Sequence, residues 1–99
     1  INPTTNWPPK NWPLESFIEL INILITKIRH IRIFITSKEK IRLFQSINTE
    51  ALMKIVNLSG KTSIAQVSAL YEKMDVVVSG DSGPLHISGA VNTKYIGIF

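Results

Sequence analysis

The chain contains no cysteine and only two histidines, His30 and His86. The absence of cysteine excludes disulfides, thiol catalysis and cysteine-ligated zinc sites. Two histidines do not make a convincing metal site by themselves, so we expect no metal cofactor. No apolar run approaches the roughly 20 residues that a membrane-spanning helix needs, and no signal peptide is evident. A cytoplasmic location is therefore the default expectation.

Charge is also sparse. The chain has 11 Lys and Arg against 7 Asp and Glu, for a net charge of +4. The basic residues are spread along the sequence, with local clusters only at 27–32 and 38–42. This is not the dense basic stripe of a nucleic-acid binder, and we expect no nucleic-acid partner. The mild positive charge weakly favours anionic small molecules or an acidic membrane surface.

The length and composition indicate one small domain. A chain of 99 residues with 44% hydrophobic residues can bury a single core, but it is short for a complete two-substrate enzyme. It begins at Ile1 and ends inside the apolar run Tyr95–Phe99. We expect it to be a fragment of a longer protein.

Helical and strand-like patterns alternate along the sequence. A helix is predicted from Pro13 or Leu14, with an apolar stripe at Phe17, Leu20, Ile21, Leu24, Ile25 and Ile28. Another is predicted to begin at Ser63, because Ser63 and Gln66 fit a capping box. Further helices are predicted at 38–47 and 84–91, a helical turn within 48–54, and strands at 31–36, 55–58, 75–79 and 94–99. The alternation predicts an α/β fold, a Rossmann-like parallel sheet with flanking helices.

The most informative segment is a glycine-rich turn, SGDSG, between the apolar run Val76–Val78 and a helix that begins near Pro84. Such a helix start presents unpaired N–H groups and the positive end of the helix dipole, which suit a phosphate. His86 lies beside the expected anion. Asp81 would repel a phosphate, so a sugar hydroxyl is its better partner. The plainer alternative is a tight connection in which Asp81 or Ser82 caps the helix.

Three other loops are expected at the same edge of the sheet, because ligands bind outside the carboxyl ends of parallel strands. These loops, 4–11, 37–39 and 59–63, bring Lys10, Glu39 and Thr62 toward one crevice. Each residue also has a plainer interpretation. Lys10 can be a solvated charge, and Glu39 can complement the dipole of the helix that it is predicted to open. Thr62 can belong to a turn before a helix cap. The sequence Gly60-Lys61-Thr62 looks like the end of a phosphate-binding P-loop, but Ile55 stands where that motif needs its first glycine, so the P-loop interpretation is rejected.

Three segments together resemble glycosyltransferase family 9, the bacterial ADP-heptose:lipopolysaccharide heptosyltransferases and their relatives. They are 10–17 (KNWPLESF), 58–64 (LSGKTSI) and 78–86 (VSGDSGPLH). The resemblance covers nearly the whole chain, and 81–86 is its most specific part. It implies that residues 1–99 form a single nucleotide-sugar-binding domain. This domain would belong to the C-terminal half of a GT-B fold, in a two-domain enzyme whose N-terminal domain is missing here.

The resemblance also implies roles for individual residues. Lys10 would neutralise the leaving nucleoside diphosphate, and Asp81 would contact the donor sugar. The residues near the diphosphate and nucleoside would be Ser82, Gly83, Pro84, His86, Thr62 and Glu39, with Glu39 at the ribose. Thr36 and Ser37 stand where relatives often carry glycines, and Gly80 replaces a frequent asparagine.

The implied reaction is a metal-independent, inverting transfer of a heptose-like sugar from an ADP-sugar. The acceptor would be a lipopolysaccharide core or a related lipid-linked glycan, at the cytoplasmic face of the inner membrane. The base would lie on the missing N-terminal domain, so the chain alone is expected to bind donor without turnover. Two alternatives stay open: another GT-B enzyme that uses a UDP-sugar, such as a UDP-sugar 2-epimerase, and a non-catalytic nucleotide-binding module. The segments 10–13 and 84–86 argue against the epimerase.

Overall fold

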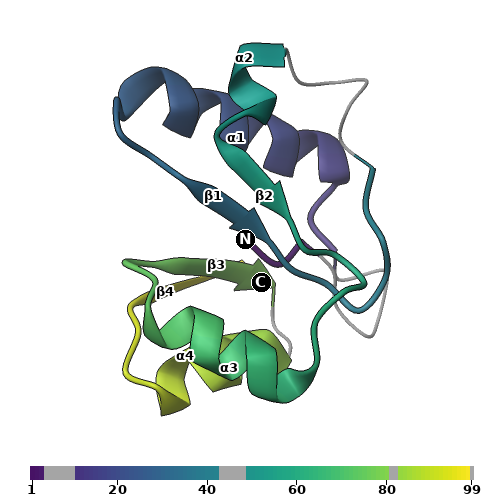
Figure 1. Cartoon of the computed structure of the whole chain (residues 1–99), viewed down its shortest axis with the longest axis vertical. Coiled ribbons are helices and arrows are strands. Elements are labelled where there is room, and N and C mark those ends of the chain that lie inside the picture. Colours follow the sequence, from purple (N-terminus) through teal and green to yellow (C-terminus); the bar gives the residue numbers. More distant parts are fainter. Residues whose placement is uncertain (4–10, 43–48, 81–82, 99) are drawn as a thin grey trace.

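The structure is a computed structural model that describes residues 1–3, 11–42, 49–80 and 83–98. Helices and strands alternate along the chain, as the sequence predicts (Figure 1). The helices are α1 (Leu14–Lys27), α2 (Thr49–Leu52), α3 (Ile64–Glu72) and α4 (Gly83–Ala90). The strands are β1 (Ile33–Ile35), β2 (Ile55–Asn57), β3 (Val77–Gly80) and β4 (Tyr95–Ile98).

The strands form two parallel pairs, β1 with β2 and β3 with β4. The first two residues of the chain join these pairs. Asn2 makes a parallel bridge to Ser79 in β3, and its backbone N–H donates to the Val78 carbonyl at 2.8 Å. On the other side, the Thr36 N–H donates to the Ile1 carbonyl at 3.0 Å. The spatial order is therefore β2, β1, Ile1–Asn2, β3, β4, and Figure 1 shows the N-terminus between the two pairs.

Helices cover both faces of this sheet. Ile33 and Ile35 of β1 are buried against Ile21 of α1 in the main apolar cluster. Thr36 is one residue out of phase with them, and its hydroxyl meets Tyr71 of α3. Since successive side chains of a strand point to opposite faces, α1 and α3 lie on opposite sides of β1. Helices α3 and α4 lie together beside β3 and β4 (Figure 1).

The sequence predicted the start of a helix more accurately than it predicted which side chains of an apolar stripe are buried. Helix α3 has the predicted capping box: the Ser63 hydroxyl accepts from the Gln66 N–H at 3.2 Å, and the Gln66 side chain accepts from the Ser63 N–H at 2.8 Å. Phe17 and Ile21 are buried as predicted. One stripe position is wrong, because Ile28 is 45% exposed.

The helix predicted over 38–47 is also wrong where the structure describes it. Residues 38–42 contain a bend at 38–39 and no helical residue, and 43–47 lie outside the described residues. The backbone groups of Ile41 have partners from β2 and the turn after it. The Ile41 N–H donates to the Ser59 hydroxyl at 2.8 Å, and the Ile41 carbonyl accepts from the Asn57 side chain at 2.6 Å. Ile41 is buried in the core from this non-helical position.

Candidate functional site

The order of the strands marks one place in the sheet for a ligand. The chain leaves Ile1–Asn2 toward β1 and β2 on one side, then crosses to β3 and β4 on the other. A parallel α/β sheet binds ligands outside the carboxyl ends of its strands, where the strand order reverses. That point lies between the end of Asn2 and the end of β3 at Gly80. The loops that leave these two ends contain Lys10 and Asp81.

A buried polar network ties the strand ends together at this edge. The Tyr71 hydroxyl lies 2.7 Å from the Thr36 hydroxyl oxygen, and the Asn2 side-chain amide donates to the same Thr36 oxygen at 3.4 Å. Thr36 is 1% exposed and Asn2 is 4% exposed. Burial raises the pKa of the Tyr71 hydroxyl, although the hydrogen bonds to Thr36 and Asn2 oppose that rise. The network fixes the end of β1 relative to the chain that leads into the loop of Lys10.

A second set of hydrogen bonds holds the loops after β1 and β2 together. The Ser59 hydroxyl donates to the Asn57 side-chain oxygen at 2.6 Å and accepts from Ile41. The Gly60 N–H donates to the Ser37 carbonyl at 2.8 Å. Gly60 has a φ of +72°, and a Cβ there would lie 3.2 Å from the Lys40 nitrogen. Glycine is required here both for the left-handed backbone and for the close approach of the two loops.

The first turn of α4 follows β3 directly. Gly83 is the first helical residue and is exposed, and a Cβ added to it would meet nothing within 4 Å. Pro84 occupies the next position, where its missing N–H costs no helical hydrogen bond. Leu85 and Ser88 are buried, whereas His86 is exposed. The helix start thus presents an exposed glycine and an exposed imidazole in its first turn, which an anion can use.

The remaining predicted site residues lie in the loops after β1 and β2. Glu39 is exposed, in the bend where its carbonyl accepts a hydrogen bond from the Ser37 hydroxyl. It does not open a helix, so the dipole interpretation of Glu39 is wrong. Thr62 is half-buried, directly before the Ser63 cap of α3. The structure thus brings Glu39, Thr62 and the start of α4 to the same edge of the sheet.

Three predicted site residues, Lys10, Asp81 and Ser82, lie outside the described residues. Their roles stay predictions. The described residues that flank them are Asn11 on one side, and Gly80 and Gly83 on the other.

The sequence analysis did not identify the residues whose buried hydrogen bonds support the site. Asn2, Thr36 and Tyr71 form its buried network, and none of them was a predicted site residue. A signal was present for Thr36, a polar residue at the end of a β-branched run. No local pattern indicates that Tyr71 contacts it across 35 residues. The buried Thr36 hydroxyl is accommodated because it is hydrogen-bonded.

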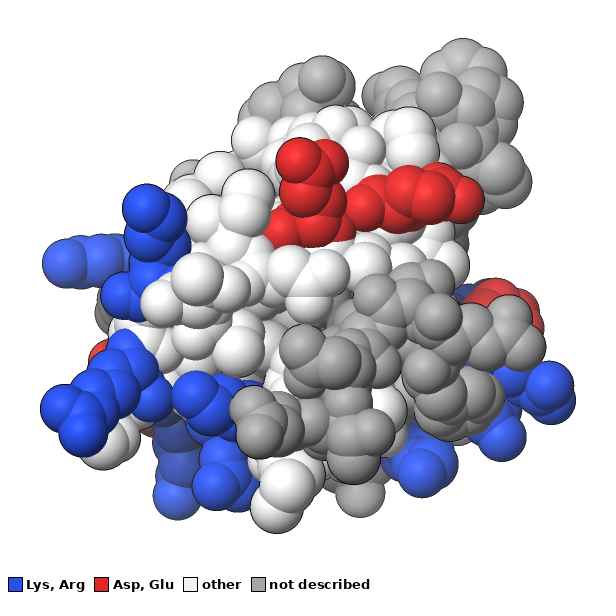
Figure 2. Space-filling model, turned by 90° about the horizontal axis from the view of Figure 1, so that it is seen from above, with Lys and Arg blue, Asp and Glu red and all other residues white. Residues whose placement is uncertain are grey.

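Figure 2 shows basic side chains at the left of this face and again along its lower right, with acidic side chains above its middle. The segments that lead into the strands are basic: Lys27, Arg29 and Arg32 before β1, Lys54 before β2, Lys73 before β3 and Lys94 before β4. They define the amino edge of the sheet, opposite the candidate site. Glu72 and Asp75 are the acidic residues in the segment before β3.

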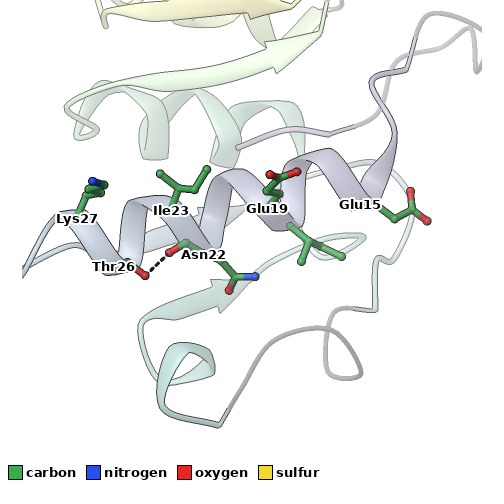
Figure 3. A pocket seen from close by; sticks show the side chains of 7 residues that line it. Glu15, Glu19, Asn22, Ile23, Thr26 and Lys27 are labelled. Atoms are coloured by element: carbon green, nitrogen blue, oxygen red, sulfur yellow. Dashed lines mark hydrogen bonds between the residues drawn. The ribbon is translucent and has the colours of Figure 1, made fainter.

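A hollow of about 380 Å³ runs along α1 (Figure 3). All of its lining residues belong to that helix, from Glu15 and Glu19 near the start to Lys27 at the end. No strand end contributes to it, so it is a surface feature of α1 and not part of the candidate site.

The described ranges give two further results. Within them, no three His, Asp or Glu side chains come together as a metal site would require. Among the described helices, none is both long enough and apolar enough to cross a membrane.

Comparison with known proteins identifies the chain's relatives. Residues 1–99 match glycosyltransferase family 9 (heptosyltransferase). The lipopolysaccharide core heptosyltransferase OpsX of Haemophilus influenzae is 33% identical over 101 residues, covering 100% of this chain and 29% of the relative. The lipooligosaccharide heptosyltransferase 2 of the same organism is 34% identical over 97 residues, covering 93% of this chain and 28% of the relative.

The fold has a solved counterpart in the Escherichia coli ADP-heptose lipopolysaccharide heptosyltransferase II. The TM-score is 0.82 at 24% sequence identity, covering 97% of this chain and 30% of that structure. This similarity confirms the predicted fold class, a parallel sheet with flanking helices that forms part of a GT-B fold. The chain spans less than a third of the length of the relatives it matches. Over the whole of its own length, however, it belongs to glycosyltransferase family 9.

Proposed function

We propose that this chain is the donor-binding part of an inverting glycosyltransferase. The enzyme transfers a heptose-like sugar from an ADP-sugar to a lipopolysaccharide core or a related glycan. The observation that carries the proposal is the position of the switch in strand order between Asn2 and β3, with the start of α4 directly after β3 in the sequence. The relatives support it, since their names describe lipopolysaccharide and lipooligosaccharide heptosyltransferases.

In this proposal the chain binds the leaving group and the sugar. The N–H groups at the start of α4 and the Lys10 ammonium hold the diphosphate, Asp81 holds a sugar hydroxyl, and Glu39 holds the ribose. Ser82, Thr62 and His86 complete the contacts to the nucleotide. Because positive groups stabilise the negative charge that develops on a departing diphosphate, these residues lower the barrier without a metal ion.

The reaction is a direct displacement at the anomeric carbon. The acceptor hydroxyl oxygen forms the new bond to that carbon from the face opposite the diphosphate. The bond from the carbon to the diphosphate oxygen breaks, and ADP leaves with the electron pair. A base from the other domain takes the acceptor proton. Since this chain has no such base in the proposal, it should bind the donor and not turn it over.

Calorimetric titration with ADP tests the donor site. We expect ADP to bind more tightly than UDP, and Lys10→Ala to weaken ADP binding by at least about tenfold, as the loss of one charge-assisted contact predicts. Lys27→Ala is the matched control, because Lys27 lies at the other end of α1 from the loop of Lys10. Asp81→Ala should weaken an ADP-sugar more than ADP.

Other outcomes would decide against the proposal. Tighter binding of UDP would favour the UDP-sugar enzyme. Equal ADP binding by the parent chain and Lys10→Ala would remove the phosphate role of Lys10. Measurable sugar transfer by this chain alone would contradict the absence of a base.

The acceptor and the location follow from the same proposal. A lipid-linked glycan would be met at the cytoplasmic face of the inner membrane. The basic amino edge, which includes Arg29 and Lys94, gives the chain a surface that anionic lipids attract. Peripheral contact with that membrane would leave the carboxyl edge of the sheet free for the donor.

A further inference from the structure

Residues 38–42 form one of the two local clusters of basic residues in the sequence, and the donor site uses none of its cations. Lys38, Lys40 and Arg42 are exposed and follow the carboxyl end of β1. Lys61 is also exposed and follows the carboxyl end of β2, which runs parallel to β1. These four basic residues therefore lie at the same edge of the sheet as the candidate site. We call them the carboxyl-edge patch.

Hydrogen bonds between the two loops bring the patch together. The Gly60 N–H donates to the Ser37 carbonyl at 2.8 Å, and the backbone of Ile41 is held by the turn after β2. A Cβ added to Gly60 would lie 3.5 Å from the Lys40 Cβ. Lys40 therefore lies beside Gly60, the residue directly before Lys61. Figure 1 shows the chain after β1 and the chain after β2 side by side.

The patch carries an unbalanced positive charge. Segments 37–42 and 59–63 contain four basic residues and one acidic residue, Glu39, so their local net charge is +3. Within the part of the chain that the structure describes, no acidic side chain forms an ion pair with any of the four. Like charges that are held close together repel one another, and an anion with several negative groups relieves that repulsion.

The diphosphate of the donor lies too far away to be this anion. In the proposed function it binds at the start of α4, directly after β3. Ile1–Asn2 lies between β1 and β3. Because neighbouring strands are about 4.8 Å apart, the ends of β1 and β2 lie roughly 10 and 14 Å from the end of β3. The nucleoside that spans this distance is neutral, and its ribose hydroxyls can donate to a carboxylate such as Glu39.

We propose that the carboxyl-edge patch binds the acceptor substrate, through phosphate or carboxylate groups of an anionic glycan. This inference rests on the proposed function, since sugar transfer requires an acceptor beside the donor. The acceptor hydroxyl that reacts meets the base of the other domain, whereas the patch holds an anionic group elsewhere on the same glycan. Four cations on two short loops are too few for the continuous basic stripe of a nucleic-acid binder.

Binding of a soluble lipopolysaccharide core oligosaccharide tests the proposal. The oligosaccharide is deacylated, so that lipid contacts do not contribute. It is compared with a neutral form, from which the phosphates are removed and in which the carboxyl groups are reduced. We expect the 99-residue chain to bind the anionic form more tightly than the neutral form, and raised salt to weaken that preference.

A pair of double variants locates the binding surface. Lys40→Ala with Lys61→Ala should weaken binding of the anionic oligosaccharide by about fivefold or more at low salt, because two charge interactions are lost. Lys73→Ala with Lys94→Ala is the matched control, since it removes the same charge from exposed positions at the amino edge. The control should change that binding by less than about twofold.

Three results would overturn the proposal. They are equal binding of the anionic and neutral forms, an equal loss in the two double variants, and a loss of ADP affinity in Lys40→Ala with Lys61→Ala as large as the loss of oligosaccharide affinity. The last result would assign these lysines to the donor site. ADP titration of the parent chain separates the two proposals. A parent that binds the anionic oligosaccharide and not ADP would contradict the donor site alone, and one that binds ADP and neither oligosaccharide would contradict the patch alone.

Discussion

Tyr71→Phe removes one buried hydroxyl from beneath the candidate site. The Tyr71 ring is 2% exposed, and its hydroxyl lies 2.7 Å from that of Thr36. Phenylalanine keeps the ring and its packing, so the substitution isolates the hydrogen bond. The Thr36 oxygen would retain only the longer contact of 3.4 Å from Asn2 among the hydrogen bonds described for it.

The size of the effect follows from burial. A typical hydrogen bond contributes about 1 kcal/mol net, and a buried group left without its partner costs about 1–3 kcal/mol. We expect Tyr71→Phe to lower the free energy of unfolding by about 2 kcal/mol. For a domain of this length that corresponds to a drop of roughly 8–16 °C in the thermal midpoint.

Denaturant unfolding measures the change, with Tyr95→Phe as the matched control. Tyr95 is 54% exposed, so loss of its hydroxyl should change stability by less than about 0.5 kcal/mol. If both substitutions have the same small effect, the buried network does not hold the strand ends and the reasoning fails.

The pH dependence provides a second, independent check on Tyr71. Burial raises the pKa of Tyr71 in the folded chain, while an unfolded tyrosine ionises near about 10. The unfolded state therefore loses its proton first as the pH rises, and ionisation favours unfolding. The stability difference between the parent and Tyr71→Phe should shrink above a pH of about 10 and be constant below about 9. A difference that stays constant across this range would contradict the burial of the hydroxyl.

Three further substitutions test other features of the chain. Gly60→Ala should destabilise it by about 1–2 kcal/mol in denaturant unfolding, because of the left-handed backbone and the contact with Lys40; a neutral result would contradict that geometry. Ser63→Ala should cost about 1 kcal/mol by removing the cap of α3, and unchanged stability would mean that the capping box contributes nothing. The double substitution of Arg29→Glu and Lys94→Glu should reduce sedimentation with anionic vesicles, because each basic residue contributes about 1 kcal/mol of attraction. Binding to neutral vesicles should not change. Equal sedimentation of the parent and the variant with anionic vesicles would exclude the amino edge as a membrane contact.

Local patterns predicted most of the fold. The apolar stripe that begins at Phe17, the capping box at Ser63 and the β-branched run into Thr36 each depend on residues close together in the sequence. The helix predicted over 38–47 is wrong in its described part, 38–42, because the backbone of Ile41 has distant hydrogen-bond partners. Ile41 bonds to Ser59, 18 residues away, and no helical periodicity can register that competition.

Local sequence patterns predicted one part of the candidate site and missed another. Sequence patterns indicated the turn before α4 and the loops of Glu39 and Thr62, because each follows a strand end. They did not indicate that Asn2 lies between β1 and β3, since Asn2 pairs with Ser79 across most of the chain. That placement defines the switch in strand order, and it is a property of the whole topology rather than of any motif.

The central position of Ile1–Asn2 connects the two strand pairs beside the candidate site. The same short segment accepts hydrogen bonds from β1, donates to β3, and leads directly into the loop of Lys10. A donor site whose lysine is attached to a better-anchored strand loses less conformational entropy when the nucleotide binds.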